Sequence, residues 1–398
     1  MFETLKNDVR SLQQEMMMLR RDFHMHPELG MTEVRTADKI MHYLKELDLH
    51  PVGGIAQTGV ACMIEGNGKG KTLLLRADMD ALPILEKTDV PFRSQNDGVM
   101  HACAHDGHMA ILLAAGKLLT ARQKHFPGNI KLVFQPGEEG LAGAFFMIHE
   151  GVLENPKVDA ALGLHLFSTF PTGQIRVREG DLMASVDQFT LEIHGKSGHG
   201  AMPESGIDAV HIAGHVITGL QGIVARELPA QSPAVIHIGK IHGGTAQNII
   251  ADNVVLSGSV RTLNEKTRTH VEERMNTLLN KIVSAFGGTC TFTYTRGYPI
   301  LRNDPGMTQL IEQTAKQVVG SENVITADPI MGSEDMAFFL EKVPGCFFFV
   351  GAGNEEKRCR YPHHSELFNF DEDALVVGLE TLVRGALTYL NTHTTSNP

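Results

Sequence analysis

The stretch TLLLRADMDALP (residues 72–83) opens with a short apolar run that is typical of a buried strand. After it, HMAILLAAGKLLTARQ (108–123) has the apolar spacing of a helix, and NIKLVFQP (129–136) is again a strand pattern. The runs TGVACMIEG (58–66) and VDAALGLHL (158–166) extend this alternation on both sides. Strands that alternate with helices predict an α/β layer built on a mostly parallel sheet.

The pattern changes near Ala184, where strands with alternating faces and two long helical patterns begin. The strand patterns are DQFTLEIHG (187–195), AVIHIGKIHGG (234–244), VVLSGSVRT (254–262) and CTFTYTR (290–296), and the helical patterns cover 207–228 and 266–286. Two helices on one face of a four-stranded antiparallel sheet would form a compact α+β unit. We therefore predict an inserted domain over residues 184–296.

Beyond about Gly297 the helical pattern returns, with one apolar strand, GCFFFVG (345–351), and a closing helix around 373–390. These segments resemble the first part of the chain rather than the insert. The prediction is therefore a discontinuous larger domain made of residues 1–183 and 297–398.

The composition indicates an enzyme-sized globular protein. At 398 residues, with 42% hydrophobic and 20% charged residues, the chain is long enough for two or three domains, each with its own core. The net charge of -11, and the lack of Lys/Arg blocks interleaved with aromatics, argue against a nucleic-acid groove or an anionic membrane face. We therefore expect a small-molecule substrate.

The first residues and the cysteines indicate in which cellular compartment the protein is expected. Residues 1–23 are amphipathic and charged, which predicts neither a secretory signal nor a membrane span, so we expect the protein in the cytoplasm. The five cysteines are scattered without a CxxC pair, which argues against a disulfide framework. Only Cys103 has chemically unusual neighbours.

Two acids lie at the end of the strand in RADMDALP (76–83). Asp78 and Asp80 are two residues apart, so they point the same way along an extended chain. Two solvated acids at a strand end explain this motif equally well when it is taken alone. Ligands usually bind at the carboxyl ends of strands in open α/β sheets. The residues at the other strand ends therefore decide whether Asp78 and Asp80 belong to a functional site.

The segment MHACAHDGH (100–108) gathers metal-ligand types just before a helix. It contains His101, Cys103, His105, Asp106 and His108. A thiolate and an imidazole two residues apart suit a borderline-soft divalent ion. A single His or Cys is more often a core residue, but the density of the whole cluster favours metal binding. A cysteine nucleophile is the weaker alternative, because its general base normally comes from a distant part of the chain.

The strand pattern KLVFQPGEEG (131–140) ends in two adjacent acids, Glu138 and Glu139. Their side chains point in different directions, so one can bind a metal while its neighbour takes a proton from metal-bound water and passes it to the leaving amine. Acids that stabilise the dipole at a helix N-terminus explain the pair equally well when it is taken alone.

Isolated histidines end two further apolar runs, namely His165 in ALGLHLF (161–167) and the pair His363 and His364 in RYPHHSELFNFDED (360–373). Each one alone is more often a structural histidine. Together the candidates number five protein ligands: Cys103, His105, Glu139, His165 and His364. With a bridging water, five ligands are about what two ions roughly 3.5 to 4 Å apart require.

The inserted domain has polar residues of its own, namely His194 and His199 among glycines, Asn248, and Arg261. The glycines would let His199 reach outward, and the single strand between Asn248 and Arg261 would let both face one crevice. Ordinary hairpin and loop residues explain the same pattern, so spacing alone leaves the choice open.

Ten ordered motifs between about residues 20 and 390 resemble the metallo-aminoacylase and hippurate hydrolase family, which is related to carboxypeptidase G and the plant auxin-conjugate amidohydrolases. They are RRDFHMHPELGMTE, RADMDALP, MHACAHDGH, QPGEEG, GLH, GHGAMPESGIDAV, GGTAQNIIADN, SVRT, MGSEDMAFF and HHSELF. The resemblance implies a zinc-peptidase sheet for the larger domain and a lid and dimerisation domain for the insert. It therefore implies a homodimer or higher homo-oligomer.

The resemblance also implies roles for individual residues. The metal ligands fall on Cys103, His105, Glu139, His165 and His364. The general base falls on Glu138, and the acid that orients a ligand falls on Asp80. In relatives the histidine that corresponds to His199 crosses from the partner subunit to polarise the scissile carbonyl, and the equivalents of Asn248 and Arg261 hold the substrate's ends.

Four positions depart from the usual family pattern, which has Gly at Ala104, Ala at Gly137, Pro at Ala251 and Pro at Glu366. None of them removes a ligand or the base. Ala104 adds a methyl group beside the metal cluster, and Gly tolerates a positive φ that Ala does not. The resemblance also implies His364 rather than His363 as the ligand, because the spacing of His364 to Phe368 and Asp371 fits the family pattern better.

The expected reaction is metal-dependent hydrolysis of the amide bond of N-acyl amino acids. A hydroxide shared by two divalent ions would attack the acyl carbonyl, Glu138 would act as general base and then acid, and one ion with His199 would stabilise the oxyanion. Zinc, manganese, cobalt and nickel all fit mixed Cys/His/Glu ligation. One rival is a dipeptidase or aminopeptidase, which should place an acid where Arg261 stands. The other is a non-catalytic amide-binding protein, which has no use for an unligated base at Glu138.

Overall fold

The computed structural model describes residues 2–393, and these fold into two compact units. The larger unit comprises residues 2–180, 302–328 and 338–393 of this range. The second unit comprises Asp181–Leu301 and Pro329–Ala337. It includes the whole of the span 184–296 and adds a separate segment, 329–337, that the sequence pattern assigned to the larger domain.

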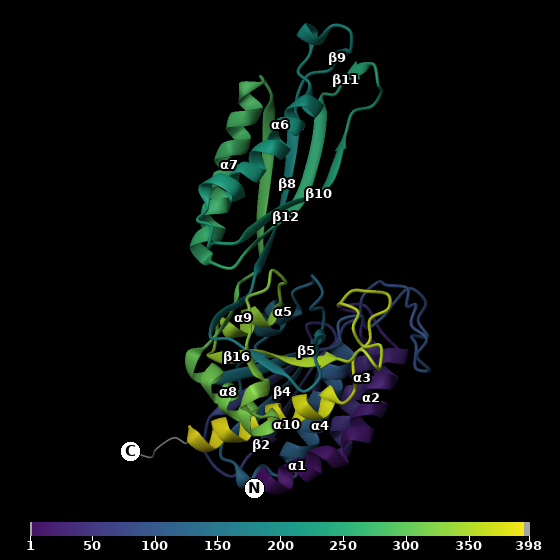
Figure 1. The fold of residues 1–398 in the computed structure, drawn as a ribbon, viewed down its shortest axis with the longest axis vertical. Helices are drawn as coiled ribbons and strands as arrows, with labels where there is room; N and C mark the ends of the chain where they lie inside the picture. Colours follow the sequence, from purple (N-terminus) through teal and green to yellow (C-terminus); the bar gives the residue numbers. More distant parts are fainter. Residues whose placement is uncertain (1, 394–398) are drawn as a thin grey trace. The chain divides into compact units, whose positions relative to one another are not determined.

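The larger unit is built on an eight-stranded sheet in the order β1-β2-β4-β3-β5-β16-β6-β15 (Figure 1). The strands are β1 (Val52–Ile55), β2 (Gly59–Glu65), β3 (Thr72–Asp78), β4 (Asn129–Gln135), β5 (Ala160–Pro171), β6 (Ile175–Val177), β15 (Val324–Thr326) and β16 (Gly345–Gly353). The middle strands β4, β3, β5 and β16 run parallel, whereas β1, β2 and β6 bring antiparallel pairings. The mostly parallel sheet predicted from the sequence is confirmed.

The parallel strands are apolar because both of their faces are covered. Every residue of β3 is buried, and so is nearly every residue of β4 and β16. The helices of this unit are α1 (Phe2–Ser11), α2 (Gln13–Met25), α3 (Val34–Glu46), α4 (His105–Thr120), α5 (Gly143–His149), α8 (Pro305–Val319) and α10 (Ala374–Thr392). The apolar helices α4 and α10 pack against each other and against β3 and β5, which places the core at the centre of the sheet.

The second unit is a four-stranded antiparallel sheet in the order β10-β12-β8-β13, with α6 and α7 along one face (Figure 1). Its elements are β8 (Ser185–His194), β10 (Ala234–Gly243), β12 (Asn253–Thr262), β13 (Thr289–Tyr298), α6 (Ala209–Gly222) and α7 (Glu265–Ala285). Burial alternates along β8, as expected for a sheet with one covered face. The predicted α+β architecture of the insert is confirmed.

The remaining strands and the remaining α-helix are short. They are β7 (Gly180–Met183), which pairs with β14 (Leu301–Asn303), the pair β9 (Gly198–His199) and β11 (Ile249–Ile250), and the helix α9 (Met336–Leu340). Both long helices of the second unit begin at a side-chain cap. Asp208 accepts hydrogen bonds from the first backbone N–H groups of α6, and Asn264 does the same for α7.

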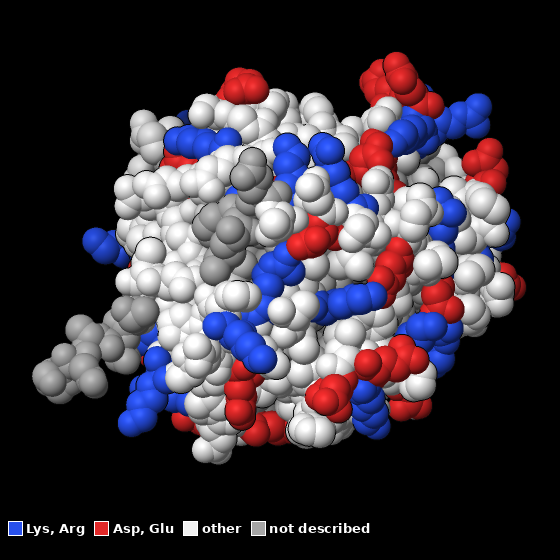
Figure 2. Space-filling model, turned by 90° about the horizontal axis from the view of Figure 1, so that it is seen from below, with Lys and Arg blue, Asp and Glu red and all other residues white. Residues whose placement is uncertain are grey.

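Acidic and basic side chains are interspersed on the face of the larger unit drawn in Figure 2, rather than gathered by sign, among the described residues. Between residues 2 and 393, the structure contains no helix with the length and apolarity needed to cross a membrane.

Candidate metal centre

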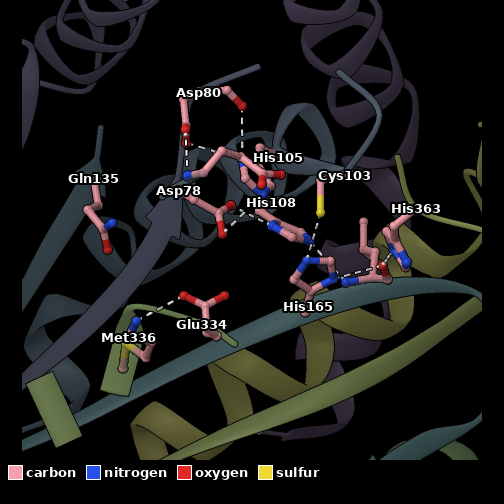
Figure 3. Close-up of polar contacts among 12 residues, drawn as sticks. Asp78, Asp80, Cys103, His105, His108, Gln135, His165, Glu334, Met336 and His363 are labelled. Carbon is pink, nitrogen blue, oxygen red and sulfur yellow. Dashed lines mark hydrogen bonds and ion pairs between the residues drawn. The ribbon is translucent and has the colours of Figure 1, made fainter. Parts of the chain in front are cut away.

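The chemistry-bearing residues of the larger unit meet at one edge of its sheet. Strand β3 ends at Asp78, strand β4 ends three residues before Glu138, and His165 lies on β5 beside them. Because these strands are parallel neighbours, their carboxyl ends share an edge, which is where open α/β sheets bind ligands. Cys103 reaches the same place from the loop that leads into α4 (Figure 3).

The five residues predicted as metal ligands lie close together. Cys103 Sγ is 3.5 Å from His165 Nε2, and His364 Nε2 is 3.2 Å from Glu139 Oε1. The donor atoms form three overlapping groups, each within 4.8 Å: Cys103 with His105 and His165, Cys103 with Glu139 and His364, and His105 with Glu138 and Glu139. The structure therefore brings all five candidates and Glu138 into one cluster.

Hydrogen bonds orient the two buried imidazoles of this cluster. His105 Nδ1 lies 2.9 Å from the carbonyl oxygen of Asp80, and His165 Nδ1 lies 3.0 Å from that of Leu166. A carbonyl oxygen only accepts, so each Nδ1 carries a proton, and in the neutral ring each Nε2 presents a lone pair. This is the tautomer that a metal-binding histidine needs.

Two donor atoms in the cluster are buried without a hydrogen-bond partner among residues 2–393, namely His105 Nε2 and Glu139 Oε1. Glu139 Oε1 lies near His364 Nε2, but the contact has the geometry of a charge pair and not of a hydrogen bond. Buried polar atoms are rarely left unpaired, so such a pair of atoms calls for an explanation. Divalent cations held by this cluster would satisfy both atoms, and the residues present therefore fit such ions.

The electrostatics of the cluster point the same way. Burial, together with Glu139 and Glu138, raises the pKa of the Cys103 thiol well above its usual value. Burial opposes the charged form of His105, but Asp78, Asp80 and Glu139 outweigh it and raise its pKa to about 10. Both shifts result from carboxylates packed into a buried space. A divalent cation neutralises this charge and allows a thiolate to form as ligand.

The two adjacent histidines near the C-terminus have different partners. His363 Nε2 donates to the carbonyl oxygen of Leu166 at 2.9 Å, and burial lowers the His363 pKa to about 4. His364 instead turns toward Glu139 through a backbone φ of 64°. The geometry favours His364 over His363 as the ligand.

Two supporting roles appear around the cluster. Asp80 holds His105 through its carbonyl oxygen, and its Oδ2 accepts the backbone N–H of Glu139 at 2.9 Å. His108 bonds Asp78 Oδ1 through Nδ1 at 2.6 Å and accepts the N–H of Leu166 through Nε2 at 2.9 Å. The sequence pattern indicates His108 only as one member of the histidine-rich cluster, without a role of its own. Its place three residues after His105, on the same side of a helix, is the signal that indicates a supporting role.

The two departures near the cluster have unusual backbone conformations. Ala104, between Cys103 and His105, is fully buried with a φ of 66°. Gly137, immediately before Glu138, has a φ of 60°, and a methyl group added there would lie 2.9 Å from Met31 Cε. Alanine therefore occupies a left-handed position at residue 104, where the family pattern has glycine. At residue 137, which is also left-handed, glycine stands where the family pattern has alanine.

The second unit separates the three residues predicted to bind substrate. His199 pairs with Ile249, and the backbone of Asn248 accepts the N–H of Gly200 at 2.8 Å, so His199 and Asn248 lie side by side. Both lie beyond the Asn253 end of β12, whereas Arg261 is near the other end, roughly 26 Å along the strand at the usual rise per residue. Asn248 and Arg261 of one chain therefore lie apart, and the arrangement in which both face one crevice, which spacing left open, is not formed within the second unit.

Arg261 has partners within the second unit. Its guanidinium donates to the carbonyl oxygen of Met331 at 3.0 Å and to Ser333 Oγ at 3.2 Å. Burial lowers the pKa of the Arg261 guanidinium, but the group stays positively charged. These bonds hold the side chain in place at the Arg261 end of β12.

Comparisons with known proteins agree with the motifs and the geometry. The chain is 40% identical to thermostable carboxypeptidase 2 of Saccharolobus solfataricus over 380 residues, 94% of this chain and 95% of that protein. It is 37% identical to an N-acetylcysteine deacetylase of Bacillus subtilis over 376 residues, 94% of this chain and 96% of that protein. The solved Bacillus subtilis YXEP structure, described as a dinuclear metal binding peptidase, superposes with a TM-score of 0.85 at 34% identity, covering 96% of this chain and 99% of that one.

The family model described as peptidase family M20/M25/M40 matches residues 74–388, which include every residue of the cluster described above. With this match and relatives that cover nearly the whole chain, the protein belongs to peptidase family M20/M25/M40.

Proposed function

We propose that this protein hydrolyses the amide bond of N-acyl amino acids, with two divalent ions held by Cys103, His105, Glu139, His165 and His364. The observation that carries the proposal is the convergence of these five residues around two buried, unpaired donor atoms, with Glu138 in the same cluster. Relatives named N-acetylcysteine deacetylase and IAA-amino acid hydrolase support an acylated amino acid as substrate.

When bound, the ions supply Lewis acidity, which polarises the acyl carbonyl and lowers the pKa of a coordinated water. The residues of the chain perform the other steps. The Glu138 carboxylate takes a proton from the attacking water and later donates it to the nitrogen of the leaving amine. Asp80 keeps His105 and Glu139 in position through the two bonds described above.

The same proposal gives the second unit a role in binding. Arg261 would hold the substrate's free carboxylate, because a fixed guanidinium matches a carboxylate in charge and shape. His199 would donate a hydrogen bond to the acyl carbonyl oxygen, beside Asn248. Since His199 and Arg261 lie at opposite ends of β12, we propose that His199 of the partner subunit completes the site of a homodimer.

Turnover by Glu138→Gln tests the assignment of the base. The variant removes the proton acceptor but keeps its shape, so turnover should fall by about 100-fold or more while metal content stays near that of the wild type. Glu139→Gln is the matched control, and it should lose metal as well as activity. The assays would use acetyl- and benzoyl-amino acids and free dipeptides, with metal analysis of each protein.

Undiminished turnover by Glu138→Gln would refute Glu138 as the base. A wild-type preference for free dipeptides over acyl amino acids would instead favour the dipeptidase alternative. A metal-loaded wild type that leaves every amide intact would favour a non-catalytic binding protein.

A further inference from the structure

The segment HPELGMTE (residues 26–33) lies against the metal centre, although neither the ligand set nor the proposed chemistry uses it. The carbonyl oxygen of Glu28 accepts the N–H of Ala81 at 2.8 Å, directly after Asp80. A Cβ on Gly30 would lie 3.0 Å from Gly137 Cα and 3.3 Å from Asp80 Oδ2. The segment therefore packs against both the strand end that carries Asp80 and the turn that leads into Glu138.

Glu33 makes the direct connection to that turn. It is fully buried, its Oε1 accepts the backbone N–H of Gly137 at 2.9 Å, and its Oε2 accepts the hydroxyl of Thr58 at 2.5 Å. A buried carboxylate that accepts two hydrogen bonds has a defined orientation. A buried N–H left without an acceptor is destabilising, so the bond to Gly137 constrains the turn.

The other side of the turn is held by main-chain bonds and by Asp80 Oδ2, which accepts the N–H of Glu139 at 2.9 Å. The carbonyl oxygen of Gly137 accepts the N–H of Gly143 at 3.1 Å, and the carbonyl oxygen of Glu138 accepts the N–H of Gly140 at 2.7 Å. Both bonds close the turn from its far end. Before Glu138, the bond to Glu33 holds the N–H side of the Pro136–Gly137 peptide, whose carbonyl oxygen accepts a longer bond from Gln135 Nε2 at 3.5 Å. The bond to Glu33 restricts this peptide, because Gly137 itself has the free rotation of glycine.

We infer that Glu33 is a positioning residue for Glu138, which it orients by anchoring the N–H of Gly137. The inference rests on the proposed function, in which Glu138 moves the proton. A displacement of about 1 Å in a reacting group can cost roughly 100-fold in rate, so one such anchor has a measurable effect. The anchor acts on proton transfer and not on the ions, because Glu33 belongs to none of the groups of donor atoms among the described residues.

Three variants separate positioning from general stability. Glu33→Ala removes both bonds. Glu33→Gln keeps a carbonyl oxygen for Gly137 and offers its NH2 group to the Thr58 hydroxyl, which can accept. Thr58→Val removes the second bond only, and it serves as a control for lost stability. Each variant would be measured for kcat, KM, melting temperature and metal content with the metal-loaded protein, on whichever amide the wild type hydrolyses best.

We expect Glu33→Ala to lower kcat by about tenfold or more, with KM and metal content near wild type. Glu33→Gln should restore most of kcat, and Thr58→Val should keep it within about threefold while its melting temperature falls. An unchanged kcat in Glu33→Ala overturns the inference. So does an equal fall in kcat in Thr58→Val at an equal loss of melting temperature.

Hydrogen–deuterium exchange provides a readout that needs no substrate. The peptide containing residues 134–140 should exchange faster in Glu33→Ala than in the wild type or Glu33→Gln, because the N–H of Gly137 loses its acceptor. Equal exchange in all three proteins overturns the inference even if the wild type is an active amidase. A wild type that hydrolyses none of the amides refutes the proposed function, while the exchange experiment still decides whether Glu33 anchors the turn.

Discussion

Ala104, between the proposed ligands Cys103 and His105, has a left-handed backbone conformation that is unfavourable for alanine. An alanine in the left-handed region is disfavoured by about 1 to 2 kcal/mol, while glycine gains about 0.4 to 1 kcal/mol of freedom in the unfolded chain. Because the first effect is larger, Ala104→Gly should raise the free energy of unfolding, by about 1 kcal/mol or less. Chemical denaturation of the metal-free protein would measure the change.

Ala114→Gly is the matched control for that prediction. Ala114 is equally buried but lies inside the right-handed helix α4, where glycine should lower the free energy of unfolding by about 1 kcal/mol or more. If both substitutions destabilise the protein equally, the conformation of Ala104 carries no strain.

At the residue scale, the metal cluster was more predictable than its supports. Glu139 lies in a short motif after a strand end, and Cys103 and His105 lie in a short motif at the start of a helix, so residue type and spacing identify them. The bond between Glu33 and Gly137 joins residues 104 positions apart, and no local pattern announces such a contact. Asn248 and Arg261 do not lie together because the extended strand β12 runs between them and separates its two ends.

At the scale of elements, one buried charge network joins α2, α4 and the loop before Cys103. His24 on α2 contacts Asp106 Oδ2 through Nδ1 at 2.8 Å and Glu86 Oε1 through Nε2 at 3.2 Å. Arg20, one turn earlier, donates to the same oxygen of Asp106 at 2.9 Å. A carboxylate at each ring nitrogen favours the charged form of His24, whose side chain connects the three segments.

This network predicts a pH-dependent stability. Burial opposes the charging of His24, but the bonds to Asp106 and Glu86 outweigh it and raise the His24 pKa. A raised pKa stabilises the folded state fully below about pH 6.5, the unfolded value, and this contribution is lost as the pH rises through the folded value. The difference in unfolding free energy between wild type and His24→Gln should therefore shrink on the alkaline side.

Denaturant titrations of the two proteins across this pH range measure that difference directly. A difference that stays constant or grows toward alkaline pH would show that His24 is not charged in the folded protein.

The elements themselves were predicted well where their pattern is local. The buried runs that became β3, β4 and β5, and the four strands and two helices of the second unit, follow from apolar periodicity. The position of β16 between β5 and β6 could not be predicted in this way. It depends on which strands pair across distant parts of the chain, and periodicity contains no information about that order.

At the scale of the whole molecule, the proposed crossing of His199 between subunits can be tested by complementation. Glu138→Gln and His199→Ala subunits would each have low activity alone. If His199 acts on the partner subunit, a mixed dimer has one complete site. Random mixing of equal amounts then gives about a quarter of wild-type activity, because half the dimers are mixed and each has one working site of two.

Native mass spectrometry would verify that mixed dimers form. Mixed dimers without recovered activity would mean that His199 does not act across subunits, and a protein that remains monomeric would remove the basis for the homodimer.

The division of the molecule was also easier to predict in outline than in detail. A change from parallel to alternating strand patterns indicates the insert, whose main span in the structure is Asp181–Leu301. Segment 329–337 joins the second unit through a bridge between Met183 and Ile330 and through the bonds from Arg261. These contacts link residues far apart in sequence, so the local pattern there could not reveal them.

The strand order of the larger unit has a consequence for how the protein folds during its synthesis. Strand β16 fills the gap between β5 and β6, yet it follows the whole of Asp181–Leu301 in the chain. As the polypeptide leaves the ribosome, all four long strands of the insert emerge before β16, which the eight-stranded sheet of the larger unit still lacks at that point. The insert can thus fold while the sheet of the larger unit still lacks β16, and until β16 arrives the edge of β5 has no strand to pair with on that side.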